Sequence, residues 1–135
     1  MNKETNIPIG WKEVKLGEIC HINSNSLTDK TDENFSFYYI DLSMVNDGAI
    51  EYPSNQILFK NSPSRARRIF KKGDILMSTV RPNLLGHAII KSEVKNCICS
   101  TGFAVVEEKN GLSCNEYIYP NLFSYNIKKQ IDSIL

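Results

Sequence analysis

The chain has 135 residues, a formal net charge of +1 at pH 7 and a hydrophobic fraction of 41%. These values fit one globular domain with its own core and leave no room for a second full domain. Apolar runs such as residues 88–90 and 103–106 are far too short to cross a bilayer, and residues 1–9 lack a signal peptide's apolar region. We therefore expect a cytoplasmic protein that has no membrane partner.

The first third of the chain predicts short elements around a polar loop. Residues 1–7 are expected to be disordered, residues 11–16 to form a short extended piece, and residues 16–22 to make one or two helical turns. Residues 23–34 are polar and rich in turn formers, which predicts an exposed loop. The aromatic, β-prone run over residues 35–44 predicts a strand.

The middle of the chain alternates turns with β-like segments. Asp47-Gly48 predicts a turn, and residues 50–52 resume β character until Pro53. Residues 61–68 combine a proline with closely spaced arginines and predict a loop or a single helical turn. Gly73-Asp74 predicts the next turn.

Four further strands are expected, over residues 75–80, 85–90, 98–99 and 103–106. Pro82 ends the first of them because proline has no N–H to donate to a sheet.

The last stretch changes to helical spacing, with Pro120 as a plausible first-turn residue. The fold class predicted is therefore α+β, with a twisted, mostly antiparallel β-sheet, short helices and a C-terminal helical segment. The apolar positions that carry the helical spacing are Tyr117, Leu122, Ile127, Ile131 and Ile134.

Charge is distributed unevenly along the chain. Residues 29–59 hold six acidic residues and one lysine, whereas residues 60–95 hold nine basic residues and two acidic ones. All four arginines lie between Arg65 and Arg81. The planar guanidinium matches phosphates and guanine edges, so this clustering favours an anionic partner. A solvated basic face is the plain alternative.

Two groups of residues could contact nucleic acid. The first combines cations with small polar side chains, which suits phosphate binding; one of its arginines could instead pair with an acid from residues 41–51. The second group is Arg81 and Asn83, which follow a predicted strand, so that they could contact bases or stabilise the turn. The first group consists of Lys60, Asn61, Ser64, Arg65, Arg67, Arg68, Lys71 and Lys72.

Metal and catalytic signatures are weak. Cys97 and Cys99 would share one face of a strand, but no second ligand pair stands at zinc-finger spacing, so the cysteines are expected to be reduced core residues. Cys99 or Ser100 could be combined with His87 and Asp74, yet no nucleophile motif surrounds them. No glycine-rich phosphate loop is present. We therefore expect no metal, no cofactor and no catalysis, with His21 and His87 as structural side chains.

Several short stretches occur together over nearly the whole chain. In combination they resemble the target-recognition domains of Type I restriction-modification specificity subunits. The stretches are IPIGWK (7–12), VKLGEI (14–19), YID (39–41), DG (47–48), PSRARR (63–68), GDIL (73–76), STVRP (78–82) and CSTGF (99–103).

The resemblance implies a partner complex. Such subunits carry two target-recognition domains separated by long helices, and each domain reads one half of a split double-stranded DNA target. Methyltransferase and restriction subunits, with their S-adenosylmethionine and ATP, supply the catalysis. Residues 1–120 would then be one such domain and residues 121–135 the start of the spacer helix. The chain would be a piece of a longer protein, a truncated gene product, or a half-subunit that forms a homodimer to supply the second domain.

The resemblance also bears on the site. Motifs shared by family members that recognise different DNA targets are expected to stabilise the fold or bind phosphate. This expectation applies to Arg65, Arg67, Arg68 and Arg81. Specificity is expected in the loops at residues 23–34 and 54–61. The function implied is DNA recognition that directs the partner subunits to one half of a bipartite target. The alternative is a protein-interaction or regulatory module that keeps the fold without reading DNA.

Overall fold

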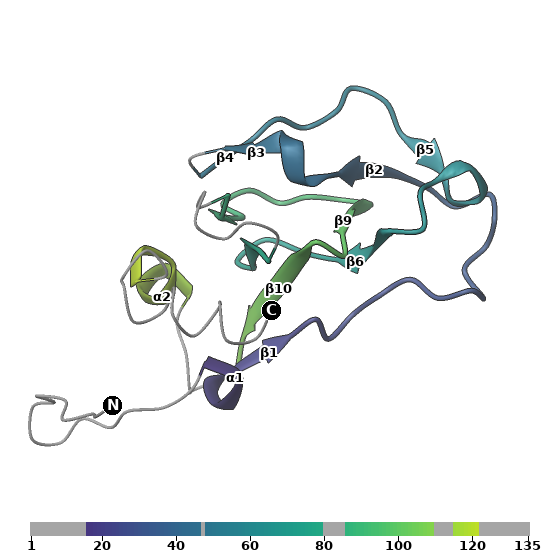
Figure 1. The fold of residues 1–135 in the computed structure, drawn as a ribbon. Helices are drawn as coiled ribbons and strands as arrows, with labels where there is room; N and C mark the ends of the chain where they lie inside the picture. The colour runs from purple at the N-terminus through teal and green to yellow at the C-terminus, as the bar shows by residue number, and fades with distance from the viewer. Residues whose placement is uncertain (1–15, 47, 80–85, 110–114, 122–135) are drawn as a thin grey trace, which may run out of the picture.

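The computed structural model describes residues 16–46, 48–79, 86–109 and 115–121. Short strands dominate these ranges (Figure 1). In chain order the elements are α1 Leu16–Ile19, β1 Cys20–Ile22, β2 Ser36–Ile40, the 3-10 helix η1 Leu42–Met44, β3 Val45–Asn46, β4 Ala49–Ile50, β5 Ile57–Leu58, the 3-10 helix η2 Phe59–Asn61, β6 Ala66–Ile69, β7 Ile75–Ser78, β8 Ala88–Ile89, β9 Cys97–Ser100, β10 Phe103–Glu108 and α2 Asn115–Asn121.

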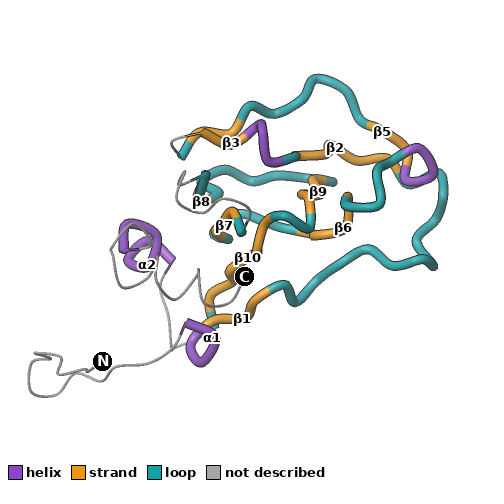
Figure 2. The backbone as a smooth tube through the Cα atoms, in the orientation of Figure 1, coloured by secondary structure: helices purple, strands orange, loops and turns teal. Residues whose placement is uncertain are grey.

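The strands form two four-stranded sheets and one small ribbon (Figure 2). The first sheet has the order β1-β10-β7-β8, and all of its neighbours are antiparallel. The second sheet has the order β5-β2-β9-β6, in which only the β2–β9 pair is parallel. Strands β3 and β4 pair with each other. The chain passes directly from β9 in the second sheet to β10 in the first, so this connection joins the two sheets.

Both faces of the central strands are buried, and the alternation of side chains along a strand explains how. On β10, Phe103 and Val105 face one core cluster while Ala104 and Val106 face another. The first of these clusters also receives Ile40 of β2 from the second sheet, so it lies between the sheets. Near-continuous apolar runs are the pattern expected of strands covered on both sides.

Two further clusters complete the layers. On the outer face of the first sheet, Ile19 of α1 and Ile118 of α2 cover the apolar side chains of β7 and β10. On the outer face of the second sheet, Phe37 and Ile98 are covered by the loop residue Leu27 and by Phe59 of η2. The described layers therefore run from the helices, through the two sheets, to a covering layer of loop and η2.

The turn that joins β9 to β10 is tightly built. Ser100 Oγ accepts a hydrogen bond from the Gly102 amide at 3.0 Å, and a Cβ atom at Gly102 would lie 2.7 Å from a methyl carbon of Leu42. Real Cβ atoms essentially never approach a neighbour this closely. Only glycine fits here without displacing Leu42, and we call Ser100–Gly102 the corner.

The predicted fold class is confirmed, since mostly antiparallel sheets and few short helices are present, with α2 as the C-terminal helical segment. The strands divide between two four-stranded sheets and the β3–β4 ribbon, whereas one sheet was predicted. The exposed loop at residues 23–34 is confirmed as well, apart from one isolated bridge at Ser26.

Several element boundaries were wrong. The strand expected over residues 35–44 ends at Ile40, because Asp41 caps η1 by accepting a hydrogen bond from the Ser43 amide at 2.9 Å. Residues 66–68, expected in a loop or helical turn, belong to β6 because their backbone pairs with β9. Pro120 lies near the end of α2 and not in its first turn.

Some predictions fall on residues outside the described ranges. They are the disordered start, the extended piece up to residue 15 and the spacer helix beyond Asn121. Within the described ranges, no helix is long and apolar enough to cross a membrane.

Candidate nucleic-acid interface

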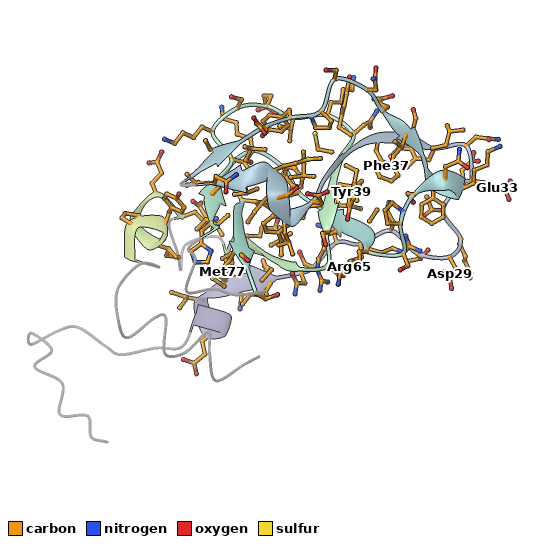
Figure 3. The ribbon with its side chains drawn as sticks, turned by 45° about the horizontal axis from the view of Figure 1, so that its top comes forward. Asp29, Glu33, Phe37, Tyr39, Arg65 and Met77 are labelled. Carbon is orange, nitrogen blue, oxygen red and sulfur yellow. The ribbon has the colours of Figure 1, made fainter. Side chains whose placement is uncertain are left out.

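Most of the predicted binding residues fall on one continuous stretch, residues 60–68, which we call the basic segment. Lys60 and Asn61 belong to η2, Ser64 and Arg65 to a turn, and Arg67 to β6. The Ala66 amide donates to the Pro63 carbonyl at 3.0 Å, which closes the turn and leaves Ser64 and Arg65 exposed at its tip. Figure 3 shows Arg65 toward the lower margin of the molecule in that view.

The corner anchors this turn. The Thr101 amide donates to the Arg65 carbonyl at 2.9 Å, so the backbone of Arg65 is fixed while its side chain projects from the fold. Thr79, at the end of β7, donates from its amide and its hydroxyl to the Gly102 carbonyl, both at 2.9 Å. The chain therefore leaves β7 at the same corner that holds Arg65.

Arg67 occupies an irregularity in β6. Ala66 pairs with Ser100 and Arg68 pairs with the adjacent Cys99, so one extra residue stands opposite β9, as in a β-bulge. The Arg67 guanidinium carbon lies 4.9 Å from the centroid of the Phe59 ring, and Nη1 donates to the Ala66 carbonyl at 3.0 Å. Aromatic contact and hydrogen bond together restrain this half-buried cation.

Arg68 projects toward a different element. Its Nε donates to the Phe103 carbonyl at 3.2 Å, at the start of β10. Arg65 lies in the turn before β6, and the bulge interrupts the alternation of side chains along that strand. The segment thus presents three arginines in three separate local settings.

None of these arginines is paired with an acid among the residues that the structure describes. The ion pairs found there both belong to Lys71, so the alternative pairing with residues 41–51 has no support in the described ranges. Lys60 and Lys72 are exposed. The basic segment therefore offers guanidinium and ammonium groups that no described carboxylate neutralises.

Lys71 differs from the other predicted cations. Its Nζ lies 3.2 Å from Asp74 Oδ1 and 2.6 Å from Glu107 Oε2. Burial lowers the pKa of Lys71, but the hydrogen bonds to Glu107 and Asp74 outweigh it and the net pKa is raised. Burial raises the pKa of Asp74, whereas hydrogen bonds from Lys71 and Ser24 lower the pKa of Glu107. The ammonium group of Lys71 is thus already held by two carboxyl groups.

The remaining predicted contacts, Arg81 and Asn83, lie outside the described residues. Two ranges in which specificity was expected, residues 23–34 and 54–61, also supply contacts to the basic segment that the sequence did not predict. Phe59 supplies the ring beneath Arg67, and residues 23–28, which we call the strap, run beside β6. No sequence spacing relates Phe59 to Arg67, because their contact depends on how η2 folds back onto the second sheet.

The cysteine and histidine side chains have structural surroundings. Cys20, Cys97 and Cys99 are buried and unbridged, and burial raises the pKa of the Cys97 and Cys99 thiols. His87 is fully buried and its Nδ1 accepts from the Ser78 amide at 3.1 Å, as expected of a structural histidine, whereas His21 is exposed. Cys114 lies outside the described residues, among which no cluster of three or more metal-ligating side chains occurs.

Comparison with known proteins decides the family. The family model described as the Type I restriction modification DNA specificity domain matches residues 8–134. The chain belongs to this family. The specificity domain is 29% identical over 120 residues to the Type I restriction enzyme HindI specificity subunit of Haemophilus influenzae (strain ATCC 51907 / DSM 11121 / KW20 / Rd). That alignment covers 84% of this chain and 24% of the relative.

Solved structures agree with this assignment. The specificity domain is similar to the HsdS subunit from Thermoanaerobacter tengcongensis, with a TM-score of 0.72 and 28% identity over 86% of this chain and 30% of that one. It is also similar to a chain from a structural study of complex assembly and conformational transition of the type I R-M system, with a TM-score of 0.74 and 30% identity over 85% and 30% of the two chains. The specificity domain thus spans about a quarter to a third of these relatives.

Proposed function

We propose that the specificity domain binds double-stranded DNA through the basic segment and reads one half of a bipartite target. The supporting observation is that Arg65, Arg67 and Arg68 are fixed by backbone, carbonyl and aromatic contacts while no described carboxylate neutralises them. The side chains of Arg67 and Arg68 are restrained, so they can neutralise a phosphate at a small entropic cost, since little side-chain freedom remains to be lost.

The residues proposed to contact DNA divide by chemistry. The arginines and the exposed lysines would bind phosphates, and the neutral side chains Asn61 and Ser64 would add hydrogen bonds to phosphate or sugar. Target choice is assigned to the loop at residues 23–34 and to residues 54–61, which the structure divides between a bend, β5 and η2 and which overlap the basic segment at Lys60 and Asn61. Arg81 and Asn83, which lie outside the described residues, remain proposed DNA contacts. The lysines in this proposal are Lys60 and Lys72, with Lys71 treated separately below.

The biological role proposed is that of the specificity component in a Type I restriction-modification complex in the cytoplasm. The domain would direct methyltransferase and restriction subunits to the target and would itself be non-catalytic. A second target-recognition domain, or a homodimer, would read the other half of the target. Mapping the sites methylated by the intact complex would reveal the half-site that this domain selects.

The salt dependence of binding to a mixed-sequence duplex tests the DNA proposal. Affinity should fall steeply between about 50 and 200 mM salt, because bound phosphates release counterions. Arg65→Ala should lower the slope of log affinity against log salt by about one. Lys95→Ala is the matched control, since Lys95 precedes β9, whereas the Arg65 carbonyl accepts from Thr101 just past the other end of that strand. Salt-insensitive or undetectable binding would instead support the protein-interaction alternative.

A further inference from the structure

Four side chains connect the two sheets beside the basic segment. Lys71 Nζ donates to Asp74 and Glu107, and the Lys71 amide donates to Asp74 Oδ2 at 3.0 Å. The second oxygen of the Glu107 carboxylate, Oε1, accepts from Ser24 Oγ at 2.7 Å. Glu107 therefore ties Lys71, which follows β6, to the first residues of the strap. We call Ser24, Lys71, Asp74 and Glu107 the clamp.

The strap is attached to both sheets. Asn23, with a φ of 55°, turns the chain after β1; its amide donates to the Val105 carbonyl at 2.9 Å, and its Oδ1 accepts from the Val105 amide at 2.8 Å. Further along, the Ile69 amide donates to the Asn25 carbonyl at 3.1 Å and the Leu27 amide to the Arg67 carbonyl at 2.7 Å. The strap therefore pairs with the edge of β6 that is not covered by β9.

This arrangement gives Lys71 a role other than the one predicted from its charge. We infer that Lys71 is a positioning residue that, through Glu107 and Ser24, holds the strap against β6 and so fixes the backbone of Arg67. The inference rests on the proposed function, because it concerns how the DNA-binding surface is held in shape. Lys71 itself does not contact phosphate in this account.

The geometry favours positioning over direct binding. The Asp74 side chain is 6% exposed, and a buried carboxylate requires a partner, so freeing Lys71 to meet a phosphate would leave Asp74 uncompensated. The Glu107 side chain is 26% exposed and stands 2.6 Å from the same ammonium group. A phosphate approaching Lys71 would therefore meet a carboxylate of its own sign beside it.

A purely electrostatic role and a positioning role of Glu107 predict opposite changes in DNA affinity for the Glu107→Gln variant. If Glu107 matters only through its charge, removing a negative charge near DNA and releasing Lys71 should strengthen binding. If Glu107 positions the strap, the variant should bind more weakly, because the amide replaces a charge-assisted hydrogen bond with a weaker one. Loss of one such contact corresponds to about three- to tenfold in affinity.

The experiment measures binding of the full chain to a mixed-sequence DNA duplex at low salt. Glu107→Gln and Lys71→Met are each expected to weaken binding by about three- to tenfold, and the double variant to be no weaker than the worse single variant, because both remove the same link. Ser24→Ala leaves the charge unchanged and is expected to weaken binding in the same direction. Amide exchange at Leu27 and Ile69 should become faster in all three single variants.

Glu51→Gln is the matched control, since it removes the same charge from an exposed position after β4, and it should bind no more weakly than the wild type. Equal or tighter binding by Glu107→Gln, with Ser24→Ala also unchanged, would overturn the positioning role. An equal loss of DNA affinity in Glu51→Gln would overturn the positioning role as well. A wild-type chain that binds no duplex would count against the proposed function itself, and the clamp would lose its basis with it.

Discussion

The arginines of the basic segment and Lys71 stand only a few residues apart, yet their surroundings are opposite. Arg65 and Arg67 have backbone or aromatic neighbours and no described carboxylate, whereas Lys71 contacts two carboxyl groups. All of them belong to the same positively charged stretch of sequence. The difference shows that a run of cations can contain members that nearby carboxyl groups hold and members that no described carboxylate neutralises, depending on which acidic residues the fold brings near.

The largest expected loss of stability comes from a substitution in the corner, which supports Arg65 and not Lys71. Gly102→Ala should lower the free energy of unfolding by about 1–3 kcal/mol, because the added Cβ would displace Leu42 from a packed core. Urea unfolding measures this. Gly17→Ala is the control: a Cβ at Gly17 meets nothing within 4 Å, so the change should be neutral or slightly stabilising. Equal stability of the two variants would contradict the tight packing at the corner.

A smaller effect is expected at the ring beneath Arg67. Phe59→Leu keeps an apolar side chain but removes the aromatic face, which should weaken duplex binding by about 0.5–1 kcal/mol. The salt slope should stay unchanged, because the positive charge of Arg67 remains. Phe35→Leu is a suitable control, since Phe35 contacts the Phe37 ring, at 5.6 Å between centroids, and no arginine among the described residues. A reduced salt slope in Phe59→Leu would show that the ring is needed for phosphate contact itself.

The smallest expected effect is the pH dependence of the stability that the clamp contributes. Hydrogen bonds from Lys71 and Ser24 hold the pKa of Glu107 below its ordinary value of 4.5. A carboxyl group whose pKa is lowered by folding stabilises the fold above that ordinary value, and this contribution is lost as pH falls through the lower folded value. The stability difference between wild type and Glu107→Gln should therefore be largest above pH 4.5 and shrink in acid. Urea unfolding over a pH series measures the difference, and a gap that widens in acid would contradict the clamp.

Local patterns in the sequence predict much of the fold. The apolar runs at residues 75–80 and 103–106 predict β7 and β10, and the polar composition of residues 23–34 predicts a loop. The end of β2 at Ile40 depends on the local cap by Asp41, whereas the position of β6 depends on contacts between distant residues. Ala66–Ile69 has a turn-like, basic sequence and becomes a strand because β9 and the strap pair with it.

The candidate site is predictable to a lesser degree. Clustered arginines point to an anionic partner, because the residue type itself carries the chemistry. The contact of Phe59 with Arg67, and of Lys71 with Glu107 thirty-six positions later, depends on tertiary structure. No periodicity within either segment signals these contacts, so charge alone could not separate Lys71 from its neighbours.

The comparison between Arg67→Ala and Lys71→Met tests the central claim most directly, because each variant removes one positive charge. Salt titrations of binding to the same duplex should give a slope reduced by about 0.9 for Arg67→Ala, since one phosphate contact is lost. Lys71→Met is expected to keep the wild-type slope while binding the duplex more weakly. Equal reductions of the slope in both variants would mean that Lys71 binds phosphate as the arginines do. That result would contradict the assignment of DNA binding to the basic segment and of positioning to the clamp.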